Sequence, residues 1–142
     1  MIRCCFVFLL LLSLARLGHC AAYEQDDAGL YARTLLELIN RYRNDYGLPS
    51  LRFDDRLNHL AMTHSFAMSR QKRMSHANFD ERFERSGSRM CVENVGWNYP
   101  TPLKLFDGWK HSSGHNENML KEGVYFVGIA EVGKYVTFFA CQ

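Results

Sequence analysis

Apolar residues recur at steps of three and four from Asp27 to Tyr46, which predicts an amphipathic helix. Its apolar positions are Tyr31, Leu35, Leu38, Ile39, Tyr42 and Tyr46, and the charged positions between them are Arg33, Glu37, Arg41 and Arg43. Gly47 suits the residue just past a helix end, and Pro49 prevents the helix from continuing. We expect a loop from there to Phe53.

A second amphipathic helix is expected after a cap at Asp54 or Asp55. Its inward stripe consists of Leu57, Leu60, Ala61, His64 and Met68. A histidine on an apolar stripe is more often a core residue with paired ring nitrogens than a ligand, and we interpret His64 in this way. The charged stretch from Arg70 to Met74 is interpreted as a solvated helix end without an assigned function.

The polar stretch 72–90 is interpreted as a surface loop that contains a short helix through the residues DERFERS. The segment MCVENVGW predicts a strand that ends at Trp97. Thr101 and Pro102 then show the pattern of a helix cap followed by proline at the first helical position. This helix is expected to end near His111.

The last part of the chain predicts a β-hairpin. A short turn capped by Ser112 or Ser113 precedes two β-rich runs, GVYFVGIAEV and YVTFFAC, which meet at Gly133 and Lys134. Helices first and an antiparallel pair at the end indicate an α+β fold, in which helices cover a sheet. A mature chain of about 120 residues makes a single domain.

The first 20 residues have the features of a secretory signal peptide. Arg3 stands near the start, an apolar run follows, and small residues surround the expected cleavage site after Cys20. Cleavage after Ala22, an uncleaved anchor and a lipidated Cys20 are the alternatives. Because the apolar run is shorter than the roughly 20 residues of a membrane span, we expect residues 21–142 to be secreted without a transmembrane anchor. In a bacterial source the periplasm is a further destination.

Removal of the signal peptide changes the charge balance. Of 17 basic residues the peptide carries Arg3 and Arg16, which leaves 15 basic against 15 acidic residues. The near-neutral mature chain therefore gives no support for binding to nucleic acid or to an anionic membrane.

Two cysteines, Cys91 and Cys141, remain in the mature chain and are expected to form a disulfide in an exported protein. Closing a loop of about 50 residues would contribute roughly 4 kcal/mol to stability. Two buried free thiols are the alternative.

Five segments follow one another along the chain: LLELINRYRNDYGLPSLRFDDRLNHLAMTHSFAMS, SHANF, CVENVGW, GWKHSSGHNENML and YVTFFAC. Their order resembles the CAP superfamily, which groups cysteine-rich secretory proteins, antigen 5 and pathogenesis-related proteins. The Ser-x-Gly-His-x-x-Asn-x-Leu pattern is similar to the bacterial-type branch. The resemblance covers residues 30–141 and implies a three-layer α-β-α sandwich with a central antiparallel sheet.

The resemblance also implies a cleft in which two histidines meet acidic residues. His76 in MSHANF matches the first histidine, and His115 in SSGHNEN matches the second. Glu93 in VENVG, followed by Asn94, matches the first acidic residue. A second glutamate of many eukaryotic relatives falls here on Ser112. The predicted cleft residues are His76, Glu93, Asn94, Ser112 and His115.

Two imidazoles and a carboxylate are a ligand set for Zn²⁺ or another divalent cation, and some relatives bind metal through their paired histidines. We expect His76 and His115 to be the metal ligands, with Glu93 as the third. Our hypothesis is a monomeric binding module, rather than an enzyme, for a small ligand such as a lipid or sterol or for an extracellular protein. The alternatives are a metal-dependent hydrolase of the peptidase type, with Glu93 as proton acceptor, and a purely structural polar network.

Overall fold

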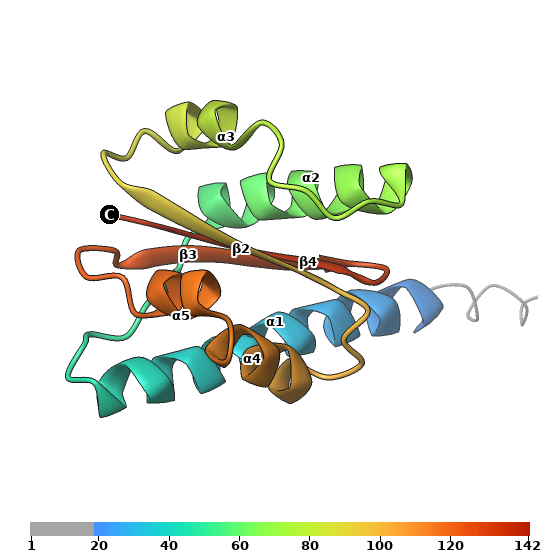
Figure 1. Ribbon diagram of the computed structural model, residues 1–142. Helices are drawn as coiled ribbons and strands as arrows, with labels where there is room; N and C mark the ends of the chain where they lie inside the picture. The colour runs from blue at the N-terminus through green and yellow to red at the C-terminus, as the bar shows by residue number, and fades with distance from the viewer. Residues whose placement is uncertain (1–18) are drawn as a thin grey trace, which may run out of the picture.

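A sheet of four strands lies between two layers of helices in the computed structural model, which describes residues 19–142 and, for side chains, residues 29–142 (Figure 1). Helices α1 (His19–Asp45), α4 (Pro102–Lys110) and α5 (Ser113–Met119) cover one face, and α2 (Asp55–Gln71) and α3 (Phe79–Ser86) cover the other. The expected α-β-α sandwich is therefore confirmed.

The N-terminal predictions fall mostly beyond this description. Residues 1–18 of the expected signal peptide lie outside the described residues. None of the helices in residues 19–142 combines the length and the apolar character needed to cross a bilayer.

The strands follow the order β1-β3-β4-β2, so β1 and β2 form the two edges of the sheet. Their bounds are β1 (Arg52–Phe53), β2 (Cys91–Trp97), β3 (Phe126–Val132) and β4 (Tyr135–Cys141). Strands β3 and β4 form the predicted hairpin, and β2 pairs with β4 in antiparallel orientation. The short β1 pairs in parallel with β3, where Arg52 N–H donates to the Tyr125 carbonyl and Asp54 N–H donates to the Val127 carbonyl, both at 3.0 Å. The three long strands are thus antiparallel, and β1 arises in a segment predicted as loop.

The helix ends follow the signals in the sequence. Gly47, just past α1, has a φ of 74°, a left-handed conformation that glycine adopts without a Cβ penalty. Asp54 caps α2 by accepting a hydrogen bond from Leu57 N–H at 2.9 Å, which decides between the two candidate aspartates. Thr101 caps α4, with Pro102 in the first turn as predicted.

Each face of the sheet buries its own core. Apolar residues between the sheet and helices α1, α4 and α5 include Leu35, Ile39, Leu105, Trp109, Val127, Ile129 and Phe138. On the opposite face the core includes Leu57, Leu60, Ala61, Ala130, Phe139 and Cys141. Side chains alternate along β2, so Glu93 faces the α2 and α3 layer whereas Asn94 faces α5. This edge strand therefore presents polar groups to both helix layers.

The predicted disulfide between Cys91 and Cys141 is present. These cysteines are the first residue of β2 and the last residue of β4, and they lie opposite one another in the strand register. The bond thus joins the edge strand to the end of the chain.

Gly128 of β3 lies where helix α2 approaches the sheet most closely. A Cβ atom at this position would collide with the carbonyl group of Leu57, which as backbone cannot turn aside. We expect Gly128→Ala to lower the free energy of unfolding by about 1–3 kcal/mol, because α2 must move away from the sheet. Urea denaturation measures the change. Gly114→Ala is the control, since nothing lies within 4 Å of a Cβ there, and equal losses at both positions would contradict the close approach.

Candidate functional site

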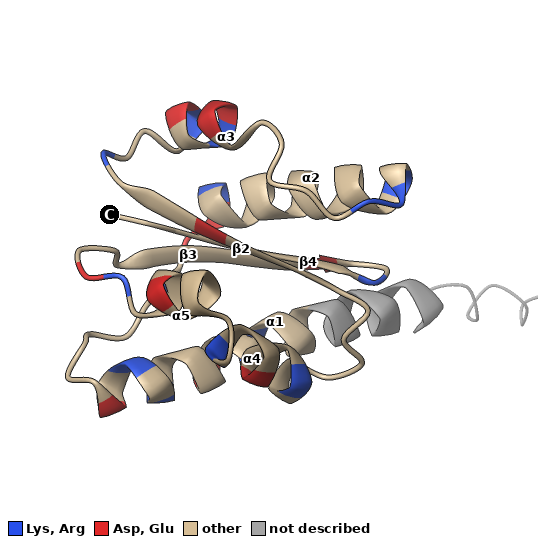
Figure 2. Cartoon of the chain, in the orientation of Figure 1, with Lys and Arg blue, Asp and Glu red and all other residues tan. Residues whose placement is uncertain are grey.

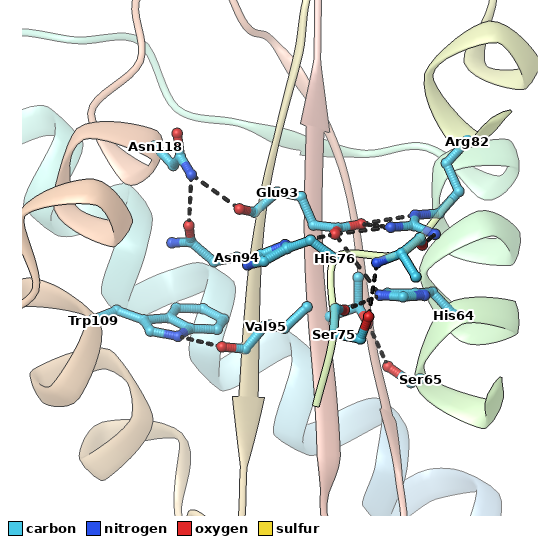
Figure 3. A network of polar contacts seen from close by, with 12 residues as sticks. His64, Ser65, Ser75, His76, Arg82, Glu93, Asn94, Val95, Trp109 and Asn118 are labelled. Carbon is cyan, nitrogen blue, oxygen red and sulfur yellow. Dashed lines mark hydrogen bonds and ion pairs between the residues drawn. The ribbon is translucent and has the colours of Figure 1, made fainter. Parts of the chain in front are cut away.

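The candidate site lies along the outer edge of β2, where both helix layers reach the strand. Strand β2 carries Glu93, the segment between α2 and α3 carries His76, and α5 carries His115. Figure 3 shows Glu93 and His76 at the strand, with Arg82 on one side and Asn118 on the other. Residues remote in sequence are therefore assembled around one edge strand.

The carboxylate of Glu93 is buried and engaged on both oxygens. Arg82 donates from Nε to Oε2 at 2.8 Å and from Nη2 to Oε1 at 2.9 Å. The Nδ1 atom of His76 lies 2.9 Å from Oε1. Because a bidentate guanidinium fixes the plane of a carboxylate, Glu93 in turn fixes the orientation of the His76 ring.

Arg82 is a site residue that sequence reasoning missed. The stretch that contains it was expected to be a surface loop with a short helix; the helix is present, but Arg82 is 6% exposed, so the surface assignment is wrong here. Arg82 stands three residues after Phe79, which packs against the core of the α2 layer. That spacing places both on one helix face, and it is the signal that would have found Arg82.

His64 lies buried on the inner stripe of α2, as predicted, and supports the segment that carries His76. Its Nε2 atom lies 2.7 Å from the carbonyl oxygen of Ser75, the residue before His76. The same nitrogen is 3.8 Å from Oε1 of Glu93. Burial, the largest cause, lowers the pKa of His64. A neutral His64 therefore anchors the loop without adding charge.

His115 lines a hollow of about 340 Å³. The other residues around this hollow are Met74, Val95, Gly96, Trp97, Tyr99, Gly108, Trp109 and Ser112. Burial, followed by an electrostatic interaction with His76, lowers the pKa of His115, which favours the neutral imidazole whose lone pair can act as a ligand. The Ser112 hydroxyl makes no cap bond to α5 and borders the same hollow.

Asn94, predicted as a cleft residue, is fully buried behind His115. Its Nδ2 atom donates to the carbonyl of His115 at 2.9 Å. Asn118 of α5 donates to Oδ1 of Asn94 and to the carbonyl of Glu93, both at 2.9 Å. This asparagine pair binds α5 to β2 and so sets the position of His115.

The donor set fits a metal only in part. Within residues 29–142, no three His, Cys, Asp or Glu side chains are grouped closely enough to hold an ion. The Glu93 oxygens already accept hydrogen bonds from Arg82. The His76 side chain, by contrast, is 54% exposed. Of the three predicted ligands, the structure pairs His76 with Glu93, and it places His115 on the hollow, whose lining includes neither His76 nor Glu93.

Comparison with known proteins supplies the family. The family model of the CAP proteins, described as the cysteine-rich secretory protein family, matches residues 36–142. The chain belongs to the CAP family. This CAP chain is 26% identical over 109 residues to YkwD of Bacillus subtilis (strain 168), described as an uncharacterized protein. The match covers 72% of the chain and 42% of YkwD.

Several solved structures share the CAP fold of this chain. Their sequence identities are low, so the similarity is one of fold alone. An extracellular protein with an SCP domain from Bacillus anthracis gives a TM-score of 0.77 at 22% identity, covering 83% of the chain and 42% of that protein. A cysteine-rich secretory protein from Staphylococcus aureus gives 0.75 at 17% identity, covering 82% and 40%. An outer surface protein of Borrelia burgdorferi gives 0.72 at 15% identity, covering 78% and 90%. These relatives are bacterial, in agreement with the predicted branch.

Proposed function

We propose that this CAP chain is a secreted binding module that takes a small ligand in the hollow beside β2 and holds a divalent cation such as Zn²⁺ between His76 and His115. Relatives described as extracellular or outer surface proteins support the secreted location. The observation that carries the site is the His76 ring, tied to a buried carboxylate on one side and 54% exposed overall.

The contact between His76 and Glu93 supports metal binding through the imidazole. Metal-binding histidines commonly donate their second ring N–H to a carboxylate, which fixes the tautomer and leaves the other nitrogen for the ion. Here Nδ1 faces Glu93, so Nε2 is the nitrogen left for a ligand. His115 would supply the second imidazole. A bound cation would polarise an oxygen of the ligand.

Binding suits the site better than hydrolysis does. A hydrolytic proton acceptor needs a free lone pair near the reacting atom, but both Glu93 oxygens are engaged by Arg82. A hollow of about 340 Å³, bordered by aromatic rings and a few polar groups, matches the small end of ligand pockets. The burial of the Arg82 and Glu93 pair favours a structural role for these two residues beside the binding role of the histidines.

Calorimetric titration of the purified protein with Zn²⁺ at pH 7 tests the proposal. We expect His76→Ala and His115→Ala each to weaken Zn²⁺ binding at least about tenfold, because each removes one imidazole donor. His59→Ala is the matched control, since His59 is an exposed histidine of α2 outside the cleft. No heat of binding in the unmodified protein, or the same affinity in all three variants, would end the metal assignment. A lowered melting temperature alone would assign the histidines to the scaffold.

A further inference from the structure

One end of the sandwich gathers exposed cations and exposed apolar side chains from three separate segments. We call it the basic–aromatic end and define it as Arg70, Lys72, Arg73, Met74, Trp97, Tyr99 and Lys134. Figure 2 shows the basic residues that end α2 and the basic residue of the β3–β4 turn at the same end of the domain. Only the fold brings these segments together, because they are far apart in sequence.

A hydrogen bond and a close approach join the segments into one surface. The Asn98 N–H, just after β2, donates to the carbonyl of Lys134 in the hairpin turn at 2.8 Å. A Cβ atom on Gly133 of the same turn would lie 3.4 Å from Oγ of Ser69 near the end of α2. The turn is therefore packed between the residues that follow β2 and the last part of α2.

The apolar members of the basic–aromatic end are open to water. The exposed fractions are 51% for Trp97, 50% for Met74 and 38% for Tyr99, whereas Trp109 is 2% exposed. All three exposed side chains border the hollow of His115. Large apolar groups that lie together at a surface mark an interaction site.

The four cations of the basic–aromatic end form no ion pairs with the carboxylates of residues 29–142. Within residues 29–142, no carboxylate lies within ion-pair distance of Arg70, Lys72, Arg73 or Lys134. Glu131 borders the adjoining hollow with Lys134, and burial raises the pKa of this carboxyl. Among residues 29–142, the four cations outnumber this carboxyl and give this end a local excess of positive charge.

We propose that the basic–aromatic end docks reversibly on a bilayer that contains anionic lipids. Tryptophan and tyrosine favour the headgroup region, and each Lys or Arg near an anionic surface raises partitioning about fivefold. A soluble polyanion would engage the cations but would gain nothing from Met74 and Trp97, which is why a bilayer is the better partner. The inference does not depend on the metal, so failure of the Zn²⁺ experiment leaves it untouched.

Tryptophan emission and sedimentation with vesicles test the docking. The exported, processed protein is mixed with vesicles of phosphatidylcholine, with or without about one third phosphatidylglycerol. We expect Trp97 emission to shift to the blue only with the anionic vesicles, while the buried Trp109 adds no shift. Trp97→Phe is expected to sediment with the anionic vesicles but to lose the spectral shift.

Paired charge variants locate the surface. Lys72→Gln/Arg73→Gln is expected to lower the partition constant at least about tenfold. Arg41→Gln/Arg89→Gln removes two exposed cations outside the basic–aromatic end and is expected to change nothing. All four positions are exposed, and melting temperatures check that each variant folds. The proposal would be overturned if both pairs of variants lost the same partition constant or if the protein bound both kinds of vesicle equally. An unshifted Trp97 emission or tighter binding to soluble polyphosphate would also overturn it.

Discussion

Replacing Arg82 with methionine is expected to lower the free energy of unfolding by about 3–5 kcal/mol. Methionine keeps the apolar stem but leaves the carboxylate of Glu93, which is 5% exposed, without its bidentate partner. A buried charge that loses its partner still bears the full cost of leaving water, and His76 offers only one contact in return. Chemical denaturation at neutral pH measures the loss.

The double variant Arg82→Met/Glu93→Gln distinguishes a stranded charge from a lost contact. It is expected to regain part of the stability, because the neutral amide costs less to bury than a carboxylate. Arg85→Met is the matched control on the same helix; Arg85 is half exposed, and its loss is expected to stay within about 0.5 kcal/mol. The single variant Glu93→Gln completes the comparison. If the double variant loses as much free energy of unfolding as Arg82→Met and Glu93→Gln lose together, the ion pair is not the cause.

Replacing Arg43 with leucine is expected to cost about 3–5 kcal/mol, because four carbonyl groups lose their donor. Arg43 of α1 is completely buried. Its guanidinium donates to the carbonyls of Pro49, Met119, Lys121 and Val124 at 2.9 to 3.4 Å. The side chain thus ties the end of α1 to the end of α5 and to the segment that enters β3.

Arg41→Leu is the matched control for this prediction. Arg41 lies on the same helix, two residues earlier, and is exposed to solvent. Urea denaturation of both variants is expected to show a change within about 0.5 kcal/mol for Arg41 and the large loss for Arg43. If both variants change the free energy of unfolding by a similarly small amount, the four carbonyls accept hydrogen bonds from water when Arg43 is absent.

Local features of the fold were predictable because their causes lie within a few residues. The Gly47 helix end, a helix cap at Asp54 or Asp55 and the hairpin turn at Gly133 each follow from neighbouring residues, and the structure has all three, with the cap at Asp54. The disulfide between Cys91 and Cys141 followed from the cysteine count of the mature chain. These predictions needed no knowledge of the tertiary structure.

The pattern of polar residues, taken alone, placed the two buried arginines at the surface. Periodicity grouped Arg43 with the charged positions of the first helix, and composition placed Arg82 in a surface stretch. Both interpretations assumed that a cation needs water. The carbonyls that replace water around Arg43 lie up to 81 positions away in the chain, so only the folded structure shows them.

The contacts that each candidate site residue makes were not predictable from the sequence. Resemblance selected His76, Glu93 and His115, while the alternation along β2 decides that Asn94 faces the opposite layer from Glu93. Asn94 therefore serves to hold α5. The spacing from Phe79 places Arg82 on an inward helix face, but nothing in the sequence identifies Glu93 as its partner.

Both edges of the sheet are blocked in ways that bear on aggregation. Strand β1 has only two residues, and on β2 the carbonyls of Glu93 and Val95 accept hydrogen bonds from Asn118 and Trp109. A long unoccupied edge invites strand addition by another molecule, the first step toward fibres. The bonds that secure α4 and α5 therefore also keep neighbouring copies from extending the sheet.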